Sequence, residues 1–271
     1  ELDPEEVDDL LLGCGSPGGE AGFNLARVVA VLLGYDRLPG TTITRYCASS
    51  LQTTRMAMHA IKAGEGEVFV SAGVETCSRH SKGGSDSLPG TANPGFASAQ
   101  ARTAAPGGGD RHDPRSFGAL PDIYAAMGRT AENVAQLRGI SRAEQDEFAV
   151  RSQNLAEKAI KAGFYAHEIT PITLPDGTVV DTDDTPHPGA TLETLSRFPP
   201  AFLPDGTVTA GNSFPLGDGA AAVVVMSDRK ARKLGITPLA RIVSTGVTAC
   251  RPRSWGSARS KHPASPCGGP G

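Results

Sequence analysis

The first 72 residues alternate between short apolar or β-branched runs and longer segments with apolar residues at helical spacing. The runs that favour strands cover residues 7–12, 41–46 and 67–72. The segments between them, 23–33 and 48–63, favour helices, and Gly64 is expected to end the second. Strands that alternate with helices form parallel sheets covered by those helices. We therefore predict an α/β fold with largely parallel strand pairing.

The rest of the chain continues less regularly. Residues 78–109 are rich in Gly, Ser, Pro and Ala and are predicted to be loops. Ser141 and Glu144 form a capping box that should open a helix ending near Ala162. Other predicted helices cover residues 119–137 and 228–234. Predicted strands cover residues 169–174, 179–180, 207–208, 219–226 (as a buried strand) and 240–248.

Composition excludes several classes of protein. A net charge of −3 and 5% aromatic residues argue against a nucleic-acid-binding surface. No apolar run approaches the ~20 residues that a membrane-spanning helix needs, so we expect no membrane partner. The five cysteines are widely spaced and lack a C-x-x-C pattern, which disfavours disulfides and zinc sites. We expect reduced thiols, a cytoplasmic location and no metal.

Cys47 is the clearest candidate for a catalytic residue. It lies where a β-rich run ends and a helix of small residues begins. A helix N-terminus offers free N–H groups and partial positive charge, which stabilise a thiolate and favour nucleophilic attack. The alternative is a buried structural thiol, because free cysteine is often a small core residue. Its local position does not decide between the two.

The wider sequence favours the nucleophile, because eight stretches together resemble the thiolase family of acyl-CoA acetyltransferases. They cover residues 39–52 (PGTTITRYCASSLQ), 61–65 (IKAGE), 71–79 (SAGVETCSR), 127–133 (MGRTAEN), 141–146 (SRAEQD), 152–154 (SQN), 206–212 (GTVTAGN) and 218–222 (DGAAA). Ketoacyl synthases also place a cysteine at a helix start, but the stretch at 127–133 fits thiolases better.

The resemblance implies a layered α/β fold with two βαβαβαββ halves and a loop domain inserted in the first. It assigns 1–77 and 215–235 to the first half, 78–214 to the loop domain and 236–250 to the start of the second half. For the intact protein it implies a homodimer or homotetramer. It also implies acyl-CoA thioesters as partners and coenzyme A as a substrate, with no metal or other cofactor.

The resemblance also implies roles for single residues. Cys47 matches the acyl-accepting nucleophile, and Met127 matches a residue lining the acyl pocket. Ala210 and Gly211 match the loop along the pantetheine arm of coenzyme A, while Thr194 matches a hydroxyl near it. Phe214 stands where many members of the family have a small residue.

The family's second half carries three further motifs: Gly-His-Pro, Asn-Glu-Ala-Phe and a cysteine before glycines. We expect this chain to lack that half, and we interpret residues 251–271 as a frameshifted tail in which His262 and Cys267 are chance matches. Two hypotheses follow. The chain descends from an acyltransferase and is inactive alone, or it is a non-catalytic truncated subunit that binds acyl-CoA or pairs with an intact thiolase.

Overall fold

The computed structural model describes residues 2–82, 90–105 and 113–249, so the interpretation of residues 251–271 lies outside them. The chain forms two compact units. Among the described residues, unit 1 comprises those within Glu1–Ala92 and Leu216–Val247, and unit 2 comprises those within Asn93–Pro215 together with Thr248 and Ala249. The domain ranges drawn from the family resemblance stay predictions.

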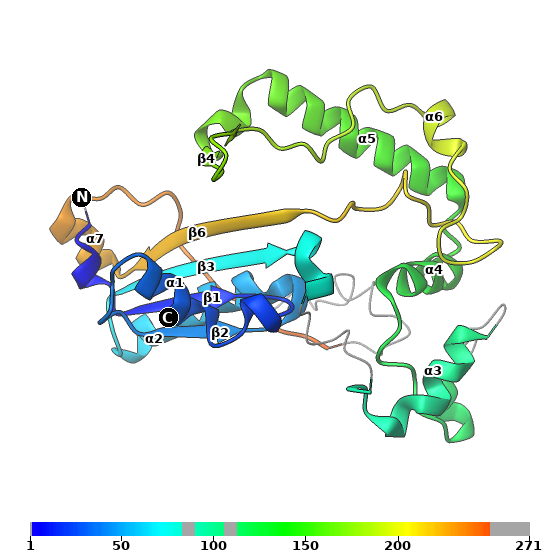
Figure 1. Cartoon of the computed structure of the whole chain (residues 1–271), viewed down its shortest axis with the longest axis horizontal. Helices are drawn as coiled ribbons and strands as arrows, with labels where there is room; N and C mark the ends of the chain where they lie inside the picture. Colours follow the sequence, from blue (N-terminus) through cyan, green and yellow to red (C-terminus); the bar gives the residue numbers. More distant parts are fainter. Residues whose placement is uncertain (1, 83–89, 106–112, 250–271) are drawn as a thin grey trace, which may run out of the picture. The chain divides into compact units, whose positions relative to one another are not determined.

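Unit 1 is built on a four-stranded sheet in the order β2-β1-β3-β6 (Figure 1). The strands are β1 (Asp9–Gly13), β2 (Gly40–Ile43), β3 (Val68–Thr76) and β6 (Asp218–Met226). The central strand β1 is parallel to both β2 and β3, whereas β6 is antiparallel to β3 along its whole length. The prediction of an α/β fold with largely parallel pairing is confirmed.

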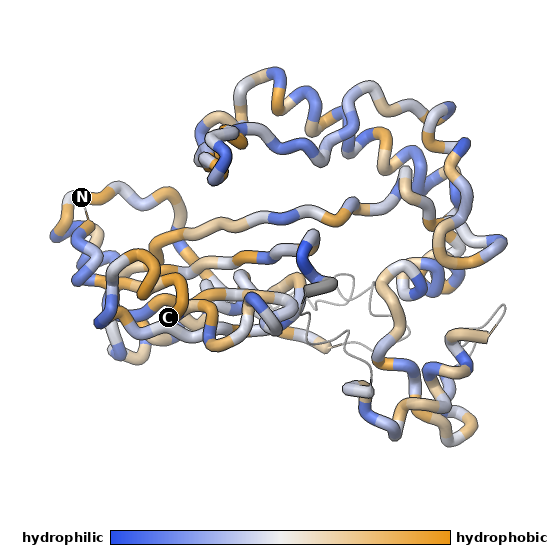
Figure 2. Tube along the Cα trace, viewed as in Figure 1, coloured by the Kyte–Doolittle hydropathy of each residue, from blue (hydrophilic) through white to orange (hydrophobic). Residues whose placement is uncertain are grey.

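The alternation of side chains along β1 places helices on both faces of the sheet. Leu10 and Leu12 pack with α1 (Leu25–Leu32) through Ala26 and Ala30, whereas Leu11 packs with α2 (Ser49–Ala63). Successive side chains of a strand point to opposite faces, so these two clusters form separate cores. Figure 2 shows α1 as hydrophobic along most of its length. The short helix α7 (Asp228–Leu234) follows β6.

Two predictions for unit 1 are wrong in detail. The strand β6 forms, but its residues 218–224 are exposed rather than buried. It is an edge strand of this sheet, hydrogen-bonded to β3 on one side. The strand predicted at 240–248 does not form in the described part of the chain. A strand needs a partner for its backbone groups, and no described strand is paired with this segment.

Unit 2 is mainly helical. It contains α3 (Ala97–Ala104), α4 (Met127–Arg138), α5 (Arg142–Lys161), α6 (Leu192–Ser196) and a two-stranded sheet of β4 (Ile172–Thr173) and β5 (Val179–Val180). The predicted capping box opens α5: Ser141 Oγ accepts from the Glu144 N–H at 3.3 Å, and the Glu144 carboxylate accepts from the Ser141 N–H at 2.7 Å. The predicted capping box at the start of α5 is confirmed.

Three predictions for residues 78–208 are corrected. Residues 78–109 contain α3 besides turns, because Asn93 caps a turn that leads into an alanine-rich stretch. The helix predicted at 119–137 begins only at Met127. Residues 207–208 form no strand; an isolated bridge joins Pro200 and Thr209 instead.

Single 3₁₀ turns connect many of these elements. They are η1 (Pro4–Glu6), η2 (Gly19–Ala21), η3 (Tyr46–Ala48), η4 (Cys77–Lys82), η6 (Pro94–Phe96), η7 (Pro114–Phe117) and η8 (Phe164–His167). Among the residues described, no helix has the length and apolar character needed to span a lipid bilayer.

Candidate active site

Cys47 lies in the short connection between the sheet and its second helix. The strand β2 ends at Ile43, η3 carries Cys47, and α2 starts two residues later at Ser49. Cys47 is exposed. The thiol therefore lies just before a 15-residue helix, as the sequence predicts, and it is not the buried structural cysteine of the alternative reading.

The turn around Cys47 is held in an unusual backbone conformation. Tyr46 has a φ of 47°, in the left-handed region that residues with a Cβ rarely adopt. The Ser49 hydroxyl stabilises this turn, because its Oγ accepts from the Arg45 N–H at 2.8 Å and donates to the Tyr46 carbonyl at 2.6 Å. Such strain persists where the surroundings determine the conformation, often at functional sites.

Two glycines allow the start of α2 to lie directly on the sheet. A Cβ on Gly13 of β1 would stand 2.5 Å from the Ser50 nitrogen, and a Cβ on Gly73 of β3 would stand 2.7 Å from the Ser50 Cβ. Real Cβ atoms do not approach other atoms so closely. Both strands must therefore lack a side chain at these positions if the helix start that follows Cys47 is to lie here.

Buried hydroxyl groups fix the next turn of α2. Thr53 is fully buried, and its Oγ1 lies 2.8 Å from Ser71 Oγ on β3. It also donates to the Ser50 carbonyl at 2.8 Å. The Thr54 hydroxyl makes a second contact with Ser71 Oγ, again at 2.8 Å. Buried polar groups are costly without partners, so these bonds favour one placement of α2 on the sheet.

A carboxylate at the end of β3 holds the segment that follows β1. Glu75 accepts from the N–H groups of Gly15 (2.6 Å) and Ser16 (3.3 Å). The Thr44 hydroxyl in turn donates to the Gly15 carbonyl at 3.0 Å. Burial, followed by the negative charge of Glu75, raises the pKa of the Cys14 thiol. Cys14 is thus a protonated core thiol, unlike exposed Cys47.

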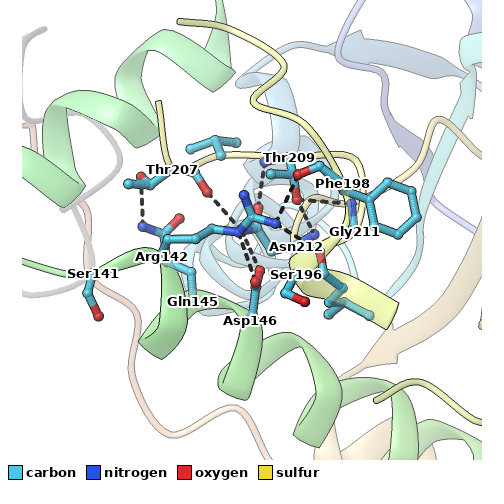
Figure 3. Close-up of polar contacts among 12 residues, drawn as sticks. Ser141, Arg142, Gln145, Asp146, Ser196, Phe198, Thr207, Thr209, Gly211 and Asn212 are labelled. Atoms are coloured by element: carbon cyan, nitrogen blue, oxygen red, sulfur yellow. Dashed lines mark hydrogen bonds and ion pairs between the residues drawn. The ribbon is translucent and has the colours of Figure 1, made fainter. Parts of the chain in front are cut away.

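In unit 2, residues 207–212 form a tight loop that contains Ala210 and Gly211 (Figure 3). The Thr209 Oγ1 accepts from the N–H groups of Gly211 and Asn212, both at 3.2 Å. The Asn212 Oδ1 accepts from the Thr209 N–H at 2.8 Å. The loop therefore closes on itself through two side chains. Ala210, at its tip, is exposed, and its main-chain groups form no hydrogen bond with the described residues.

A carboxylate on α4 holds the start of this loop. Glu132 is 6% exposed and accepts from the Thr207 N–H at 2.9 Å and the Val208 N–H at 2.9 Å. It also accepts from the Thr207 hydroxyl at 3.0 Å. A Cβ on Gly206 would collide with the Glu132 carboxylate, so this glycine permits the close approach. Glu132 ties the loop to the helix that begins at Met127.

Met127 and Thr194 lie at the beginnings of α4 and α6. Met127 is 57% exposed, and the Thr130 hydroxyl donates to its carbonyl at 2.7 Å. The Thr194 hydroxyl belongs to a capping box: it accepts from the Thr191 N–H at 3.1 Å and donates to the Thr191 carbonyl at 2.9 Å. This hydroxyl therefore serves to start α6.

The five site residues predicted from the sequence are divided between the two units. Cys47 belongs to unit 1, whereas Met127, Thr194, Ala210 and Gly211 belong to unit 2. Within unit 2, Gly211 lies against Leu195 and Phe198, so the loop contacts α6 next to Thr194. The roles of these residues toward acyl-CoA stay predictions.

Sequence reasoning assigned no role to four residues that build these sites: Gly13, Glu132, Asp146 and Asn212. The last three lie within the stretches that resemble thiolases. The burial of both carboxylates on α4 and α5, which makes fixed partners necessary, is visible only in the folded chain. Nothing in the sequence pairs either of them with the loop at 207–212.

Among the residues described, no group of three or more His, Cys, Asp or Glu side chains could hold a metal ion. These features define unit 1 as a helix-covered α/β sheet whose second helix starts beside an exposed cysteine.

Comparison with known proteins identifies the family. Residues 1–229 match the family model of the thiolase N-terminal domain. The chain is 41% identical over 260 residues to an acetyl-CoA acetyltransferase of Cupriavidus necator, and 37% identical over 262 residues to a β-ketoadipyl-CoA thiolase of Pseudomonas aeruginosa. The chain therefore belongs to the thiolase family.

A solved structure agrees with this assignment. The crystal structure of an acetyl-CoA acetyltransferase from Bacillus anthracis matches 93% of this chain with a TM-score of 0.72 and 34% identity. The matches to the Cupriavidus and Pseudomonas proteins cover 93% and 94% of this chain, which spans 63% of the length of each. The fold is thus that of the thiolase N-terminal part, as the resemblance implied.

Proposed function

We propose that this chain supplies the acyl-accepting half of a thiolase-type acyltransferase. The observation that carries the proposal is the exposed Cys47 thiol in a strained turn immediately before α2. Its exposure leaves the sulfur accessible to an incoming thioester. Membership of a family whose relatives are named acetyl-CoA acetyltransferase and β-ketoadipyl-CoA thiolase supports the same reaction class.

In the proposed step, the Cys47 sulfur attacks the carbonyl carbon of an acyl-CoA. A new thioester bond forms to Cys47 while the bond to the coenzyme A sulfur breaks. The thiol proton leaves Cys47 and ends on the released coenzyme A. Covalent catalysis of this kind divides a difficult transfer into two easier steps. Coenzyme A thus acts as a substrate and product, and the step requires no metal or other cofactor.

Unit 2 would contribute contacts to the acyl-CoA. Exposed Ala210 at the loop tip offers its main-chain N–H and C=O groups to the amides of a pantetheine arm, while half-buried Gly211, whose N–H already donates to Thr209, offers its C=O. Met127, exposed at the start of α4, offers an apolar side chain to an acyl group. Thr194 would act indirectly, since its hydroxyl caps α6. These roles are the ones that the resemblance to thiolases implies for these residues.

The first test is intact-mass measurement of the purified chain after incubation with acetyl-CoA. The proposal predicts the gain of one acetyl group, lost in Cys47→Ala. Cys77→Ala is the matched control, because it removes a different accessible thiol and should still be acetylated. A folded wild-type chain that gains no acetyl group, or one that is acetylated equally with Cys47→Ala, would contradict the proposal.

We further propose that the chain alone stops at the acyl-enzyme. Neither Gly-His-Pro nor Asn-Glu-Ala-Phe occurs in the 271 residues, and a catalytic unit that lacks some of its groups loses orders of magnitude in turnover. Thiolysis of acetoacetyl-CoA by free coenzyme A, followed by loss of the 3-ketoacyl absorbance, tests this. Turnover at the rate of an intact family member would refute it.

A second candidate function is that of a non-catalytic subunit in the cytoplasm. The exposed apolar side chains of Val223 and Val224, on opposite faces of β6, and of Leu239 after α7 favour it, because a partner that covers exposed apolar side chains stabilises the association. The candidate predicts that the chain joins an intact thiolase, which we propose forms a homodimer or homotetramer by itself. Light scattering after gel filtration, with and without that thiolase, would measure the mass. A monomer in both samples would exclude this function.

A further inference from the structure

The loop at 207–212 is held at its far end by a buried ion pair on α5. Asp146 is 3% exposed, and its Oδ2 accepts from Arg142 Nε at 2.8 Å, one helical turn earlier. Its Oδ1 accepts from Asn212 Nδ2 at 2.9 Å (Figure 3). Both carboxylate oxygens therefore have partners, one on the same helix and one in the loop.

The charge of Asp146 determines which way the Asn212 amide faces. Asn212 Nδ2 donates to Asp146 and to the Thr207 carbonyl, each at 2.9 Å, and both of these oxygens can only accept. The Asn212 Oδ1 must consequently point the other way, where it accepts from the Thr209 N–H. A carboxylate on α5 thus selects the amide orientation that closes the loop around Ala210.

Arg142 extends this arrangement to α6. Its Nη2 donates to the carbonyls of Leu195 (2.8 Å) and Phe198 (3.1 Å), where α6 ends. Gln145, on the same face of α5, donates to the Thr207 hydroxyl at 2.9 Å. Residues three and four apart share one face of a helix, so a single face of α5 contacts both segments. Asp146 keeps the Arg142 guanidinium in place for its two carbonyls.

We propose that Asp146, together with Arg142, is a positioning residue for acyl-CoA binding. Asp146 touches no predicted binding residue itself; it acts through Asn212 on the loop of Ala210 and Gly211, and through Arg142 on the helix of Thr194. A loop held in its binding geometry loses less entropy when the ligand arrives, which strengthens binding. This inference rests on the proposed function.

The test combines hydrogen exchange with coenzyme A binding in the full chain. In Asp146→Asn, the oxygen of the new side-chain amide can still accept from Arg142. Its NH₂ group then faces Asn212 Nδ2, and the two donor groups repel each other. We expect exchange at residues 207–212 to rise about 10- to 100-fold, since a charged hydrogen bond is lost. Glu147→Gln is the matched control, because Glu147 is the exposed next residue on the same helix. It should change neither exchange nor binding.

The outcomes separate this inference from the proposed function. Two results together support the positioning role. They are faster hydrogen exchange in the loop and coenzyme A binding that is at least about tenfold weaker, as expected for a lost charged hydrogen bond. Faster exchange in a chain whose wild type binds no coenzyme A supports the role of Asp146 in the loop and refutes the proposed function. Unchanged exchange in folded Asp146→Asn, or unchanged binding despite a loosened loop, overturns the inference.

A second variant covers the case in which Asp146→Asn does not fold. Arg142→Gln removes the donors to the Leu195 and Phe198 carbonyls from a partly exposed position. We expect faster exchange at residues 192–198 and weaker coenzyme A binding. If this folded variant binds coenzyme A as the wild type does, the inference is overturned.

Discussion

Gly13 and Ser50 are in such close contact that a Cβ on Gly13 would stand 2.5 Å from the Ser50 backbone nitrogen. Gly13 ends the central strand β1, and Ser50 lies in the first turn of α2. The absence of one side chain on the sheet therefore sets how deeply the helix start is seated. Because Cys47 precedes this helix start, the same contact positions the proposed nucleophile.

Gly13→Ala should displace the start of α2. Ser49 and Ser50 contribute backbone atoms to the collision, so rotation of a side chain cannot relieve it. We expect the free energy of unfolding to fall by about 1–3 kcal/mol, as for other overpacked sites. We also expect slower acetylation of Cys47. Denaturant unfolding and intact mass would measure the two effects.

The control for this substitution is Gly219→Ala on β6, where a Cβ would meet nothing within 4 Å. It should leave both measurements unchanged or slightly raise stability, because alanine restricts the unfolded chain more than glycine does. Equal stability of Gly13→Ala and Gly219→Ala would show that α2 moves away from the sheet without cost.

Alkylation should distinguish the Cys14 and Cys47 thiols. Burial and the charge of Glu75 raise the pKa of the Cys14 thiol above its ordinary value of 9.0. Cys14 should therefore remain protonated and unlabelled at pH 8, while exposed Cys47 reacts with iodoacetamide. Peptide mass spectrometry after a short pulse would identify the labelled residue. Equal labelling of both cysteines in the folded chain would contradict this view of the site.

The same shift predicts a loss of stability at alkaline pH. As the pH rises past 9, the Cys14 thiol of the unfolded chain ionises first, since its pKa in the folded chain is raised. The unfolded state then binds fewer protons than the native state, so the free energy of unfolding falls with increasing pH. Cys14→Ala should unfold with a shallower dependence on pH between 9 and 10 in thermal melts. An identical slope in wild type and variant would exclude a contribution from Cys14.

Glu132→Gln should loosen the beginning of the loop at 207–212. The glutamine has one acceptor oxygen in place of two, and its NH₂ group would replace the oxygen that accepts from the Thr207 N–H and hydroxyl, each at 3.0 Å. Hydrogen bonds to a charged group contribute about 1.5–3 kcal/mol, so we expect a loss of stability of about 2 kcal/mol. Chemical denaturation measures it, with exposed Glu147→Gln as the reference. A loss below about 0.5 kcal/mol, the range of ordinary surface substitutions, would show that the loop does not depend on this carboxylate.

Ser141→Ala should weaken the start of α5. It removes the oxygen that accepts from the Glu144 N–H, and the loss of such a cap costs about 1 kcal/mol. Ser152→Ala tests the same exchange at an exposed position inside the helix, where alanine is the better helix former. The two variants should shift the melting temperature in opposite directions. A shift of the same sign and size in both would argue against the capping role.

Local patterns predicted most of the elements correctly. The strands around β1, β2 and β3, the helices α1 and α2, and the capping box of α5 follow from spacing and capping residues that act over a few positions. The errors lie where tertiary partners decide. Residues 219–226 have the apolar character of a buried strand, yet β6 lies at the edge of the sheet. Residues 240–248 favour a strand, but no described strand pairs with them.

The sequence by itself determined the α/β class, the thiolase family and the place of Cys47 before a helix, because each depends on residue type and order along the chain. Only the tertiary structure decided how that helix is seated and how the loop of Ala210 is held. Gly13 and Ser50 are 37 residues apart, and Glu132 reaches Thr207 across 75. Steric contact and hydrogen bonding act over a few ångströms, so such pairs become visible only when the folded chain brings them together.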